Sequence, residues 1–127
     1  MKKIMLVIAV SILSNCNTKR TCEDLKEGKY MLVSKETGTT VIERKVNEQI
    51  EINESLGVHV KYDLKWKDNC TYLLYNDQFL DDNYWIRSDT KDTLIVEITD
   101  IMADSYIVKA SMGSTDLVIE SELLIIE

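Results

Sequence analysis

The sequence predicts an all-β fold, an antiparallel meander of about eight strands that forms a small barrel or a two-layer sandwich. Two observations carry this prediction. Residues 58–67 alternate strictly between apolar and polar side chains, which is the period of a strand with one buried and one wet face. Short segments rich in Val, Ile, Thr and Tyr recur at the close spacing typical of barrels and sandwiches. With 127 residues and no internal repeat, the chain has room for one such domain.

The elements are expected in a simple order along the chain. A short helical turn is expected over 21–26, where Thr21 can cap it. The stretch 76–90 interrupts the alternation with Asn and Asp and is expected to be a long loop. Strands are expected where alternation and β-forming residues coincide between turn signals, at 28–34, 39–46, 48–53, 58–67, 70–75, 93–99, 104–112 and 116–126.

Apolar and aromatic residues on these strands give the expected core. Val58, Val60, Tyr62, Leu64 and Trp66 share one face of the best strand. Further core positions are expected on the adjacent strand and on the last one, at Tyr72, Tyr75, Ile119, Leu123 and Ile125.

The first fifteen residues have the form of a secretory leader. Lys2 and Lys3 form a basic start, and the apolar residues 4–13 follow them. A membrane-spanning helix needs about 20 apolar residues, so this stretch is too short to remain as a span. We expect a leader helix over 1–15, a lipidated cysteine and tether over 16–27, and a single all-β domain over 28–127.

The leader ends in Leu13-Ser14-Asn15-Cys16, which resembles the lipobox of bacterial lipoproteins. The resemblance implies cleavage before Cys16, a diacylglycerol thioether on its thiol, and an acyl chain such as palmitate on the new amine. Asn15 departs from the smaller residue usual there, and the alternative is an accidental cysteine after an ordinary signal peptide. Two or three acyl chains hold a protein stably on a membrane. The expected location is therefore the bacterial cell envelope, at the outer membrane, with Cys16 as the lipid anchor.

The remaining cysteines form an even pair. Once Cys16 is lipidated, Cys22 and Cys70 are left in an oxidising compartment, where disulfides persist. A bridge between them closes a loop of about 49 residues and contributes on the order of 4 kcal/mol in the chain-entropy model. Two buried free thiols are the alternative.

The charge of the chain is strongly acidic. The 22 acidic side chains outnumber the 15 basic ones. Loss of residues 1–15 removes Lys2 and Lys3, which leaves 13 basic side chains and a net charge of −9. Such a chain repels phosphate backbones, so nucleic acid is not an expected partner. The expected partners are the membrane, through Cys16, and a protein of the envelope.

No constellation in the sequence predicts catalysis. The single histidine, His59, falls on the wet face of the best strand, and no serine lies in a Gly-x-Ser-x-Gly motif. No cysteine spacing suits zinc, and the acidic loop lacks the order of a calcium loop, so no metal or cofactor is expected. Aromatic and acidic residues that interleave in the 76–90 stretch are the candidate binding residues: Phe79, Asp81, Asp82, Tyr84 and Trp85. A hydrophobic lid on the barrel is the alternative role for the aromatic members.

Several short motifs resemble a family of small, uncharacterised bacterial envelope lipoproteins. They are Thr21-Cys-Glu-Asp-Leu-Lys-Glu-Gly28, Ile42-Glu-Arg44, Gln49-Ile-Glu51, Leu64-Lys-Trp-Lys-Asp-Asn-Cys-Thr-Tyr72 and Asp104-Ser-Tyr106. Leu25 departs from the Phe often found there. The resemblance implies an envelope lipoprotein with a structural Cys22–Cys70 pair and supplies no catalytic residue. Some members bear the label DNA topoisomerase IV, but that activity needs a nucleophilic tyrosine in a large basic DNA gate, which a small acidic chain does not offer.

The expected function is therefore non-catalytic. The first expectation is an envelope-anchored binding or interaction module that uses one sheet face or the 76–90 stretch. The alternative is a lipocalin-like carrier of a small apolar ligand inside the barrel. An open, apolar-lined interior favours the carrier, and a filled interior beside an exposed aromatic loop favours the module.

Overall fold

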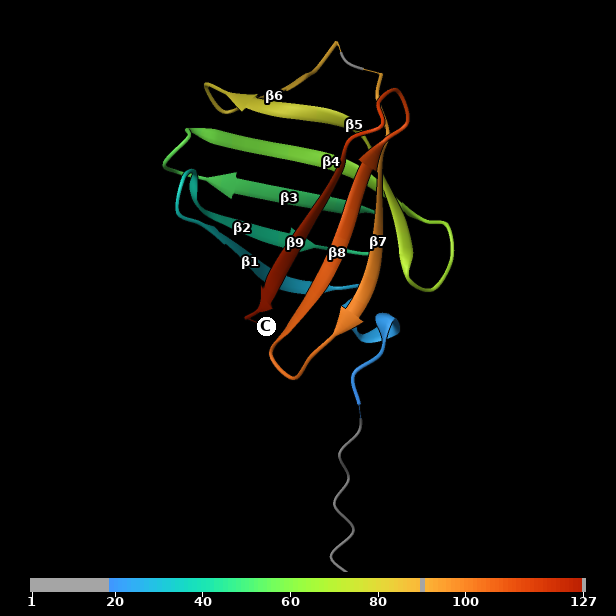
Figure 1. Cartoon of the computed structure of the whole chain (residues 1–127). Coiled ribbons are helices and arrows are strands. Elements are labelled where there is room, and N and C mark those ends of the chain that lie inside the picture. Colours follow the sequence, from blue (N-terminus) through green and yellow to red (C-terminus); the bar gives the residue numbers. More distant parts are fainter. Residues whose placement is uncertain (1–18, 90, 127) are drawn as a thin grey trace, which may run out of the picture.

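A single antiparallel sheet curls on itself to form a closed barrel in the computed structural model, which describes residues 19–89 and 91–126 (Figure 1). The leader helix expected over 1–15 and the expected lipid anchor Cys16 lie outside the described residues. The described elements are a 3-10 helix η1 (Cys22–Leu25) and the strands β1 (Gly28–Ser34), β2 (Gly38–Arg44), β3 (Glu48–Asn53), β4 (Val58–Trp66), β5 (Thr71–Asp81), β6 (Tyr84–Arg87), β7 (Leu94–Ile101), β8 (Ser105–Met112) and β9 (Val118–Ile125).

The strand order is a meander closed by two further pairings. Consecutive strands pair antiparallel from β1 to β5 and from β7 to β9, β7 pairs with β5, and β1 pairs with β9. The β6 strand pairs with β5 alone and extends the sheet beyond the barrel wall. The eight remaining strands make the barrel, so the predicted all-β meander is confirmed and the barrel is the form it takes.

The inward face predicted for β4 is confirmed from Val60 onward, whereas Val58 at the start of the strand is only partly buried and lies outside the core cluster. Val60 and Leu64 are buried, and Tyr62 and Trp66 on the same face pack against the core. The core is one cluster along the barrel interior, and its buried members include Leu25, Tyr30, Ile42, Tyr72, Leu74, Val96, Tyr106, Val108 and Leu123.

Two core predictions are wrong. Tyr75 pairs with Asp63 on the outer face of the barrel, because Leu74 and Leu64 form the inward pair beside them. Ile119 is 53% exposed although Leu123 on the same strand is buried. The reason is the short contact between β1 and β9, which comprises the pairs Tyr30–Ile125 and Met31–Leu124 and leaves the first part of β9 without a neighbour on that side.

A disulfide fastens η1 to the β4–β5 turn. Cys22 and Cys70 are bonded, with their Cα atoms 5.3 Å apart, so the predicted bridge is confirmed and the free-thiol alternative is wrong. The predicted helical turn is confirmed as well. Asp24 and Thr21 form a capping box, in which the Thr21 backbone N–H donates to the Asp24 carboxylate at 2.8 Å. Leu25 is buried in the core, so η1 covers one end of the barrel.

The long loop predicted over 76–90 is wrong. β5 continues to Asp81 and returns as β6 through the two-residue turn Asp82-Asn83, whose φ angles of 43° and 72° suit a type I′ hairpin. The alternation of apolar and polar side chains breaks at Asn76, because β5 has a bulge there. Asn76 adopts a φ of 50°, and β5 has one more residue than β4 across the bulge. The Asn76 side-chain amide donates to Asp63 at 2.9 Å across the bulge.

Candidate functional site

The end of the barrel beneath η1 is filled by a buried arginine. Arg44, the last residue of β2, is 2% exposed and turns inward. Its Nε donates to Gln49 Oε1, its Nη1 to the Leu25 carbonyl and its Nη2 to the Tyr72 hydroxyl, each at 2.8 Å. Every guanidinium nitrogen therefore has an acceptor, which is what a buried cation requires.

Three tyrosine rings surround this guanidinium. Its central carbon lies 4.7 Å, 4.5 Å and 5.9 Å from the ring centres of Tyr30, Tyr72 and Tyr106. Tyr30 meets Tyr106 edge to face and donates its hydroxyl to the Leu25 carbonyl at 2.9 Å, which ties η1 to the barrel. Burial raises the pKa of all three tyrosines, so they remain neutral. We call Arg44 and these three tyrosines the arginine plug.

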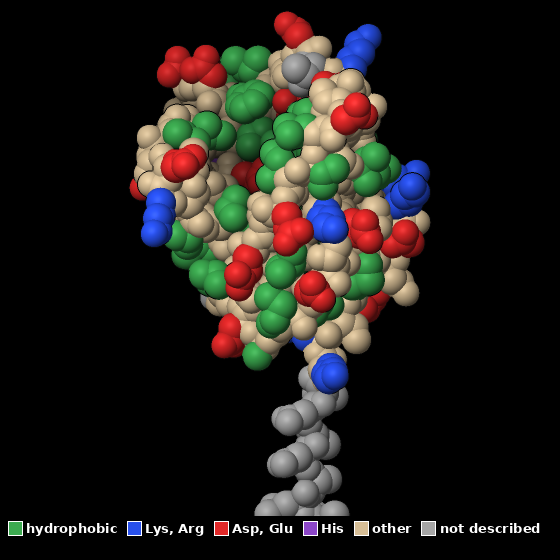
Figure 2. Space-filling model, viewed as in Figure 1, with side chains coloured by type: hydrophobic (Ala, Val, Ile, Leu, Met, Phe, Trp, Pro, Cys, Tyr) green, Lys and Arg blue, Asp and Glu red, His purple; other side chains and the backbone are tan. Residues whose placement is uncertain are grey.

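The opposite end of the barrel is hollow. Above the two residue pairs that join β1 to β9, the strands diverge, and Figure 2 shows a hollow with hydrophobic side chains around it and acidic side chains in its depth. In the same view of the ribbon, β9 lies on one side, the β1–β2 and β3–β4 turns on the other, and the β5–β6 hairpin above (Figure 1). The barrel is thus plugged at one end and open at the other.

A carboxylate lies in the wall of the interior. Glu51 on β3 stands between Ile42 of β2 and Val60 of β4, both of which are buried inward-facing residues. Glu51 keeps some access to solvent, yet burial raises its pKa against the opposing effects of Arg44 and of a hydrogen bond from Tyr62. The Tyr62 hydroxyl donates to this carboxylate, and burial, together with the charges of Glu51 and Asp77, raises the Tyr62 pKa. The otherwise apolar wall of the interior therefore carries one carboxyl group, that of Glu51, which accepts a hydrogen bond from Tyr62.

The turns at the rim are fastened to one another. Asn53, at the end of β3, is buried and donates its side-chain amide to the Thr37 carbonyl at 3.0 Å and to the Thr40 hydroxyl at 3.1 Å. Its side-chain oxygen accepts from the Leu56 N–H at 3.1 Å. The β1–β2 and β3–β4 turns are held together by this one side chain, so this part of the rim is preformed.

The predicted binding residues are divided between two faces of the β5–β6 hairpin. Phe79 pairs with Val60 and Asp81 with Tyr84, so these side chains continue the inner face of the barrel wall beyond the rim. Phe79 is 42% exposed and Tyr84 is 76% exposed. The structure therefore brings Phe79, Asp81 and Tyr84 to the open end of the barrel.

Trp85 and Asp82 do not join that face. Trp85 pairs with Leu80 on the outer face, where its ring meets the His59 ring edge to face at 4.8 Å between centres. Asp82 lies in the hairpin turn. His59, expected as an exposed strand residue, is partly covered by this contact. In the residues that the structure describes, no group of three or more His, Cys, Asp and Glu side chains could hold a metal ion.

Sequence reasoning did not single out the polar groups of the interior. Arg44, Glu51 and Tyr62 appeared only within quoted motifs or as core, and none was named a site residue. A signal was present, because Arg44 follows Ile42 at strand period, and a charged residue in phase with buried ones faces inward. The same phase places Gln49 and Glu51 on the inner face of β3.

Comparisons with protein-family models, with curated proteins and with solved structures found no match to this chain. Among the helices of the described residues, none has the length and apolar character needed to span a membrane.

Proposed function

We propose that this chain is an envelope lipoprotein whose barrel binds a small, partly apolar ligand and releases it unchanged. The observation that carries the proposal is the asymmetry of the barrel, which the arginine plug fills at one end and which is hollow at the other (Figure 2). Of the two functions expected from the sequence, this asymmetry favours the carrier, because small-molecule sites are concave, mostly apolar and few per protein.

The apolar residues around the open end support a ligand with an apolar body. A contiguous patch of exposed apolar side chains marks a place where something binds. Those near the open end include residues of the β5–β6 hairpin, of the start of β9 and of the β3–β4 turn: Phe79, Tyr84, Ile86, Leu117, Val118, Ile119 and Leu56.

The wall carboxylate supports a polar group on the same ligand. Glu51 has a raised pKa because burial disfavours its charge, and its described partners are Tyr62 and the charge of Arg44. A ligand group that donates a hydrogen bond to Glu51 relieves that penalty. The proposed ligand is therefore amphiphilic.

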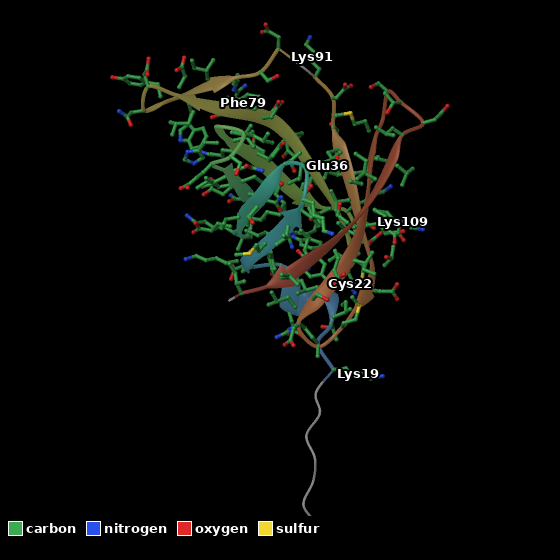
Figure 3. The ribbon with its side chains drawn as sticks, turned by 60° about the vertical axis from the view of Figure 1, so that its left-hand side comes forward. Lys19, Cys22, Glu36, Phe79, Lys91 and Lys109 are labelled. Atoms are coloured by element: carbon green, nitrogen blue, oxygen red, sulfur yellow. A yellow bond between two sulfur atoms is a disulfide. The ribbon has the colours of Figure 1, made fainter. Side chains whose placement is uncertain are left out.

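The first described residues, which follow the proposed anchor in the sequence, lie at the plugged end. Figure 3 shows Lys19 and Cys22 at one end of the molecule and Phe79 and Lys91 at the other. A lipid on Cys16 would hold the plugged end toward the membrane and leave the open end facing away from it. The leader, the Cys22–Cys70 disulfide and the resemblance to envelope lipoproteins support export, since disulfides persist in oxidising compartments.

Ligand binding is tested with a neutral apolar fluorophore, N-phenyl-1-naphthylamine, whose emission rises in apolar surroundings. Ser121 pairs with buried Val108 and therefore faces inward, whereas Glu120 beside it faces outward and is exposed. We expect saturable enhancement with the native chain, loss of it in Ser121→Trp, and retention in the matched control Glu120→Trp. Equal enhancement in both variants, with both folded, would overturn the carrier.

Anchoring is tested separately by fractionation of intact cells. The native chain is expected in the membrane fraction and in the detergent phase, and Cys16→Ala is expected to leave both. A native chain that remained soluble in the periplasm would show that the lipoprotein assignment is wrong.

One observation favours a second candidate, a protein-interaction module. Tyr84 and Ile86 are 76% and 51% exposed on a hairpin that projects beyond the barrel wall. A photo-crosslinking residue placed at Tyr84 would capture an envelope protein under this candidate, whereas one at the exposed Val33 would not. Absence of an adduct specific to position 84 would count against the interaction module.

A further inference from the structure

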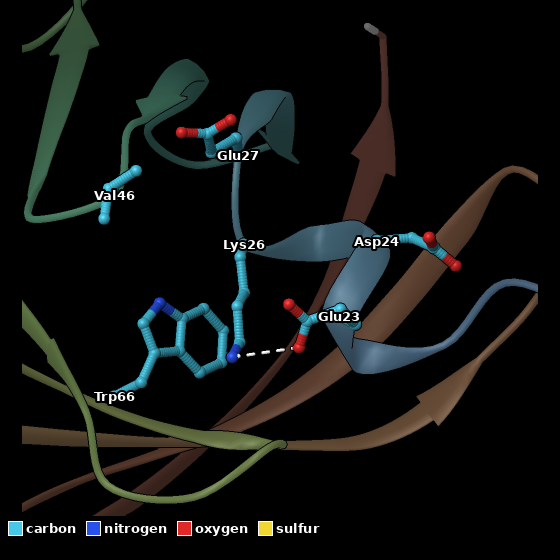
Figure 4. A pocket seen from close by; sticks show the side chains of 6 residues that line it. All are labelled: Glu23, Asp24, Lys26, Glu27, Val46 and Trp66. Atoms are coloured by element: carbon cyan, nitrogen blue, oxygen red, sulfur yellow. Dashed lines mark ion pairs between the residues drawn. The ribbon is translucent and has the colours of Figure 1, made fainter.

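A second pocket lies at the plugged end, outside the barrel. Its volume is about 490 Å3, and it opens between η1, the β2–β3 turn and the end of β4 (Figure 4). The side chains that line it are Glu23, Asp24, Lys26, Glu27, Val46 and Trp66. Sites for small molecules have volumes in this range.

Trp66 lines this pocket, and a buried aromatic neighbour holds its ring in place. Its ring packs against the Tyr72 ring, with 4.9 Å between centres, and Tyr72 is fully buried beside Arg44. The indole orientation is therefore fixed by the arginine plug. The ring N–H is buried and has no hydrogen-bond partner among the described residues. An unsatisfied buried donor is costly, and each such group calls for an explanation.

Lys26 covers the ring by weak contacts alone. Its ammonium lies 5.3 Å from the Trp66 ring centre and 3.0 Å from the Glu23 carboxylate, as Figure 4 shows. The Glu23 side chain is 69% exposed, and an exposed ion pair or cation–π contact adds little stability. Val46 in the β2–β3 turn also lines the pocket and is 67% exposed. Neither Lys26 nor Val46 belongs to the core cluster, so either side chain can move without disturbing the core.

The polar groups of the pocket select the chemistry of a ligand. Three carboxylates and one ammonium line it, so it disfavours anions such as phosphates and sulfates. An ammonium ligand can pair with the carboxylates but cannot accept from the indole N–H. A hydroxyl group does both, because it accepts from the indole and donates to a carboxylate. Figure 4 shows Asp24 turned away, toward its capping contacts, while Glu27 stands near Val46.

We propose that this pocket binds a neutral sugar. The sugar ring displaces the Lys26 side chain and lays its apolar face on Trp66, a hydroxyl accepts from the indole N–H, and a neighbouring hydroxyl donates to Glu27. Lys26 then keeps its ion pair with Glu23 at the edge of the site. This site is separate from the hollow of the barrel and does not depend on the carrier proposal.

The experiment follows the indole N–H itself. The chain contains two tryptophans, Trp66 and Trp85, so a ¹⁵N–¹H spectrum contains two indole signals, and Trp85→Phe assigns them. Chitotetraose and maltotetraose are the sugar probes, and inorganic phosphate and spermidine are the charged controls. We expect one or both sugars to shift the Trp66 signal saturably at millimolar concentration and to leave the Trp85 signal unmoved.

Three variants sharpen the result. Lys26→Ala removes the cover, and the sugar should bind about two- to fivefold more tightly, as expected for the loss of a weak surface contact. Glu27→Gln replaces the carboxylate that accepts from the sugar hydroxyl with a weaker acceptor, so this variant should bind the sugar less tightly. Lys65→Ala, at an exposed position next to Trp66 in the sequence, is the matched control and should not change the affinity. No shift with either sugar, a shift with phosphate or spermidine instead, or unchanged affinity in Lys26→Ala would overturn the proposal.

Discussion

The guanidinium of Arg44 contacts Tyr72 in two ways, with its central carbon 4.5 Å from the ring centre and its Nη2 donating to the hydroxyl at 2.8 Å. Tyr72 in turn packs against Trp66. One buried tyrosine thus joins the cation inside the barrel to the aromatic ring of the pocket outside it. Burial alone would lower the Arg44 pKa, but the interactions with Tyr72, Tyr106 and Tyr30 raise it above its ordinary value, so the side chain stays charged.

Shortening the arginine should destabilise the barrel. Arg44→Lys keeps the charge but cannot reach Gln49, Leu25 and Tyr72 together, so buried acceptors lose their donor. We expect a loss of about 3 kcal/mol in the free energy of unfolding, measured by urea denaturation. The same substitution at exposed Arg87 is the control and should change stability by less than about 0.5 kcal/mol. Equal effects at both positions would contradict the plug.

Removing the disulfide should lower stability without abolishing the barrel. The bridge spans a sequence separation of 48, and in the chain-entropy model its loss costs on the order of 4 kcal/mol. The double variant Cys22→Ser/Cys70→Ser is expected to unfold at lower denaturant concentration and to be unaffected by dithiothreitol. The native chain should fall to the same midpoint when reduced. A native chain that resists reduction with no change of midpoint would show that the bridge does not stabilise the fold.

The pH dependence of stability should carry a contribution from Glu51. The unfolded chain releases this proton near the ordinary pKa of 4.5, whereas the folded chain retains it to higher pH. The contribution is therefore complete below about pH 4.5 and is lost as the pH rises through the raised folded-state pKa. Glu51→Gln should lose less stability than the native chain between acid and neutral pH. Glu54→Gln, on the exposed β3–β4 turn, should follow the native profile.

Two glycines with positive φ should respond differently to alanine. At Gly38 (φ 83°), a Cβ would lie 2.5 Å from Ser55 Oγ and 2.9 Å from Ser55 Cβ, whereas at Gly57 (φ 65°) nothing lies within 4 Å. Gly57→Ala should cost about 1 kcal/mol, the strain of the left-handed conformation. Gly38→Ala should cost roughly 2 kcal/mol more, because the β1–β2 and β3–β4 turns must move apart. Adding Ser55→Gly should recover part of that difference and little at Gly57.

Much of the fold could be predicted because side-chain alternation and turn residues are local signals. Periodicity gave the strands of the barrel and the inward face of β4, and elimination gave the disulfide partners. The β5–β6 hairpin was not predicted because the bulge at Asn76 shifts the alternation of inward and outward side chains by one residue. A segment in which the alternation shifts resembles an irregular loop. Ile119 was placed in the core because no local pattern reports that β9 lacks a neighbour there.

Less of the candidate site could be predicted, for a similar reason. Phe79, Asp81 and Tyr84 were identified by composition and do lie at the open end, yet Trp85 faces outward because the hairpin alternates. Arg44, Glu51 and Tyr62 come from three different strands and meet only when β2, β3 and β4 pair in register. Local sequence patterns show each of these residues but not the contacts that form between them when the strands pair.

The position of the disulfide also decides how the molecule carries mechanical load. A pull applied upstream of Thr21 enters the fold at Cys22, which is covalently bonded to the β4–β5 turn at Cys70. Residues 23–69, including β1 to β4, therefore lie inside a closed covalent loop and cannot be drawn out by that force. The tension passes directly into β5, and a stretched chain would extend by the residues after Cys70 alone until the bridge is reduced.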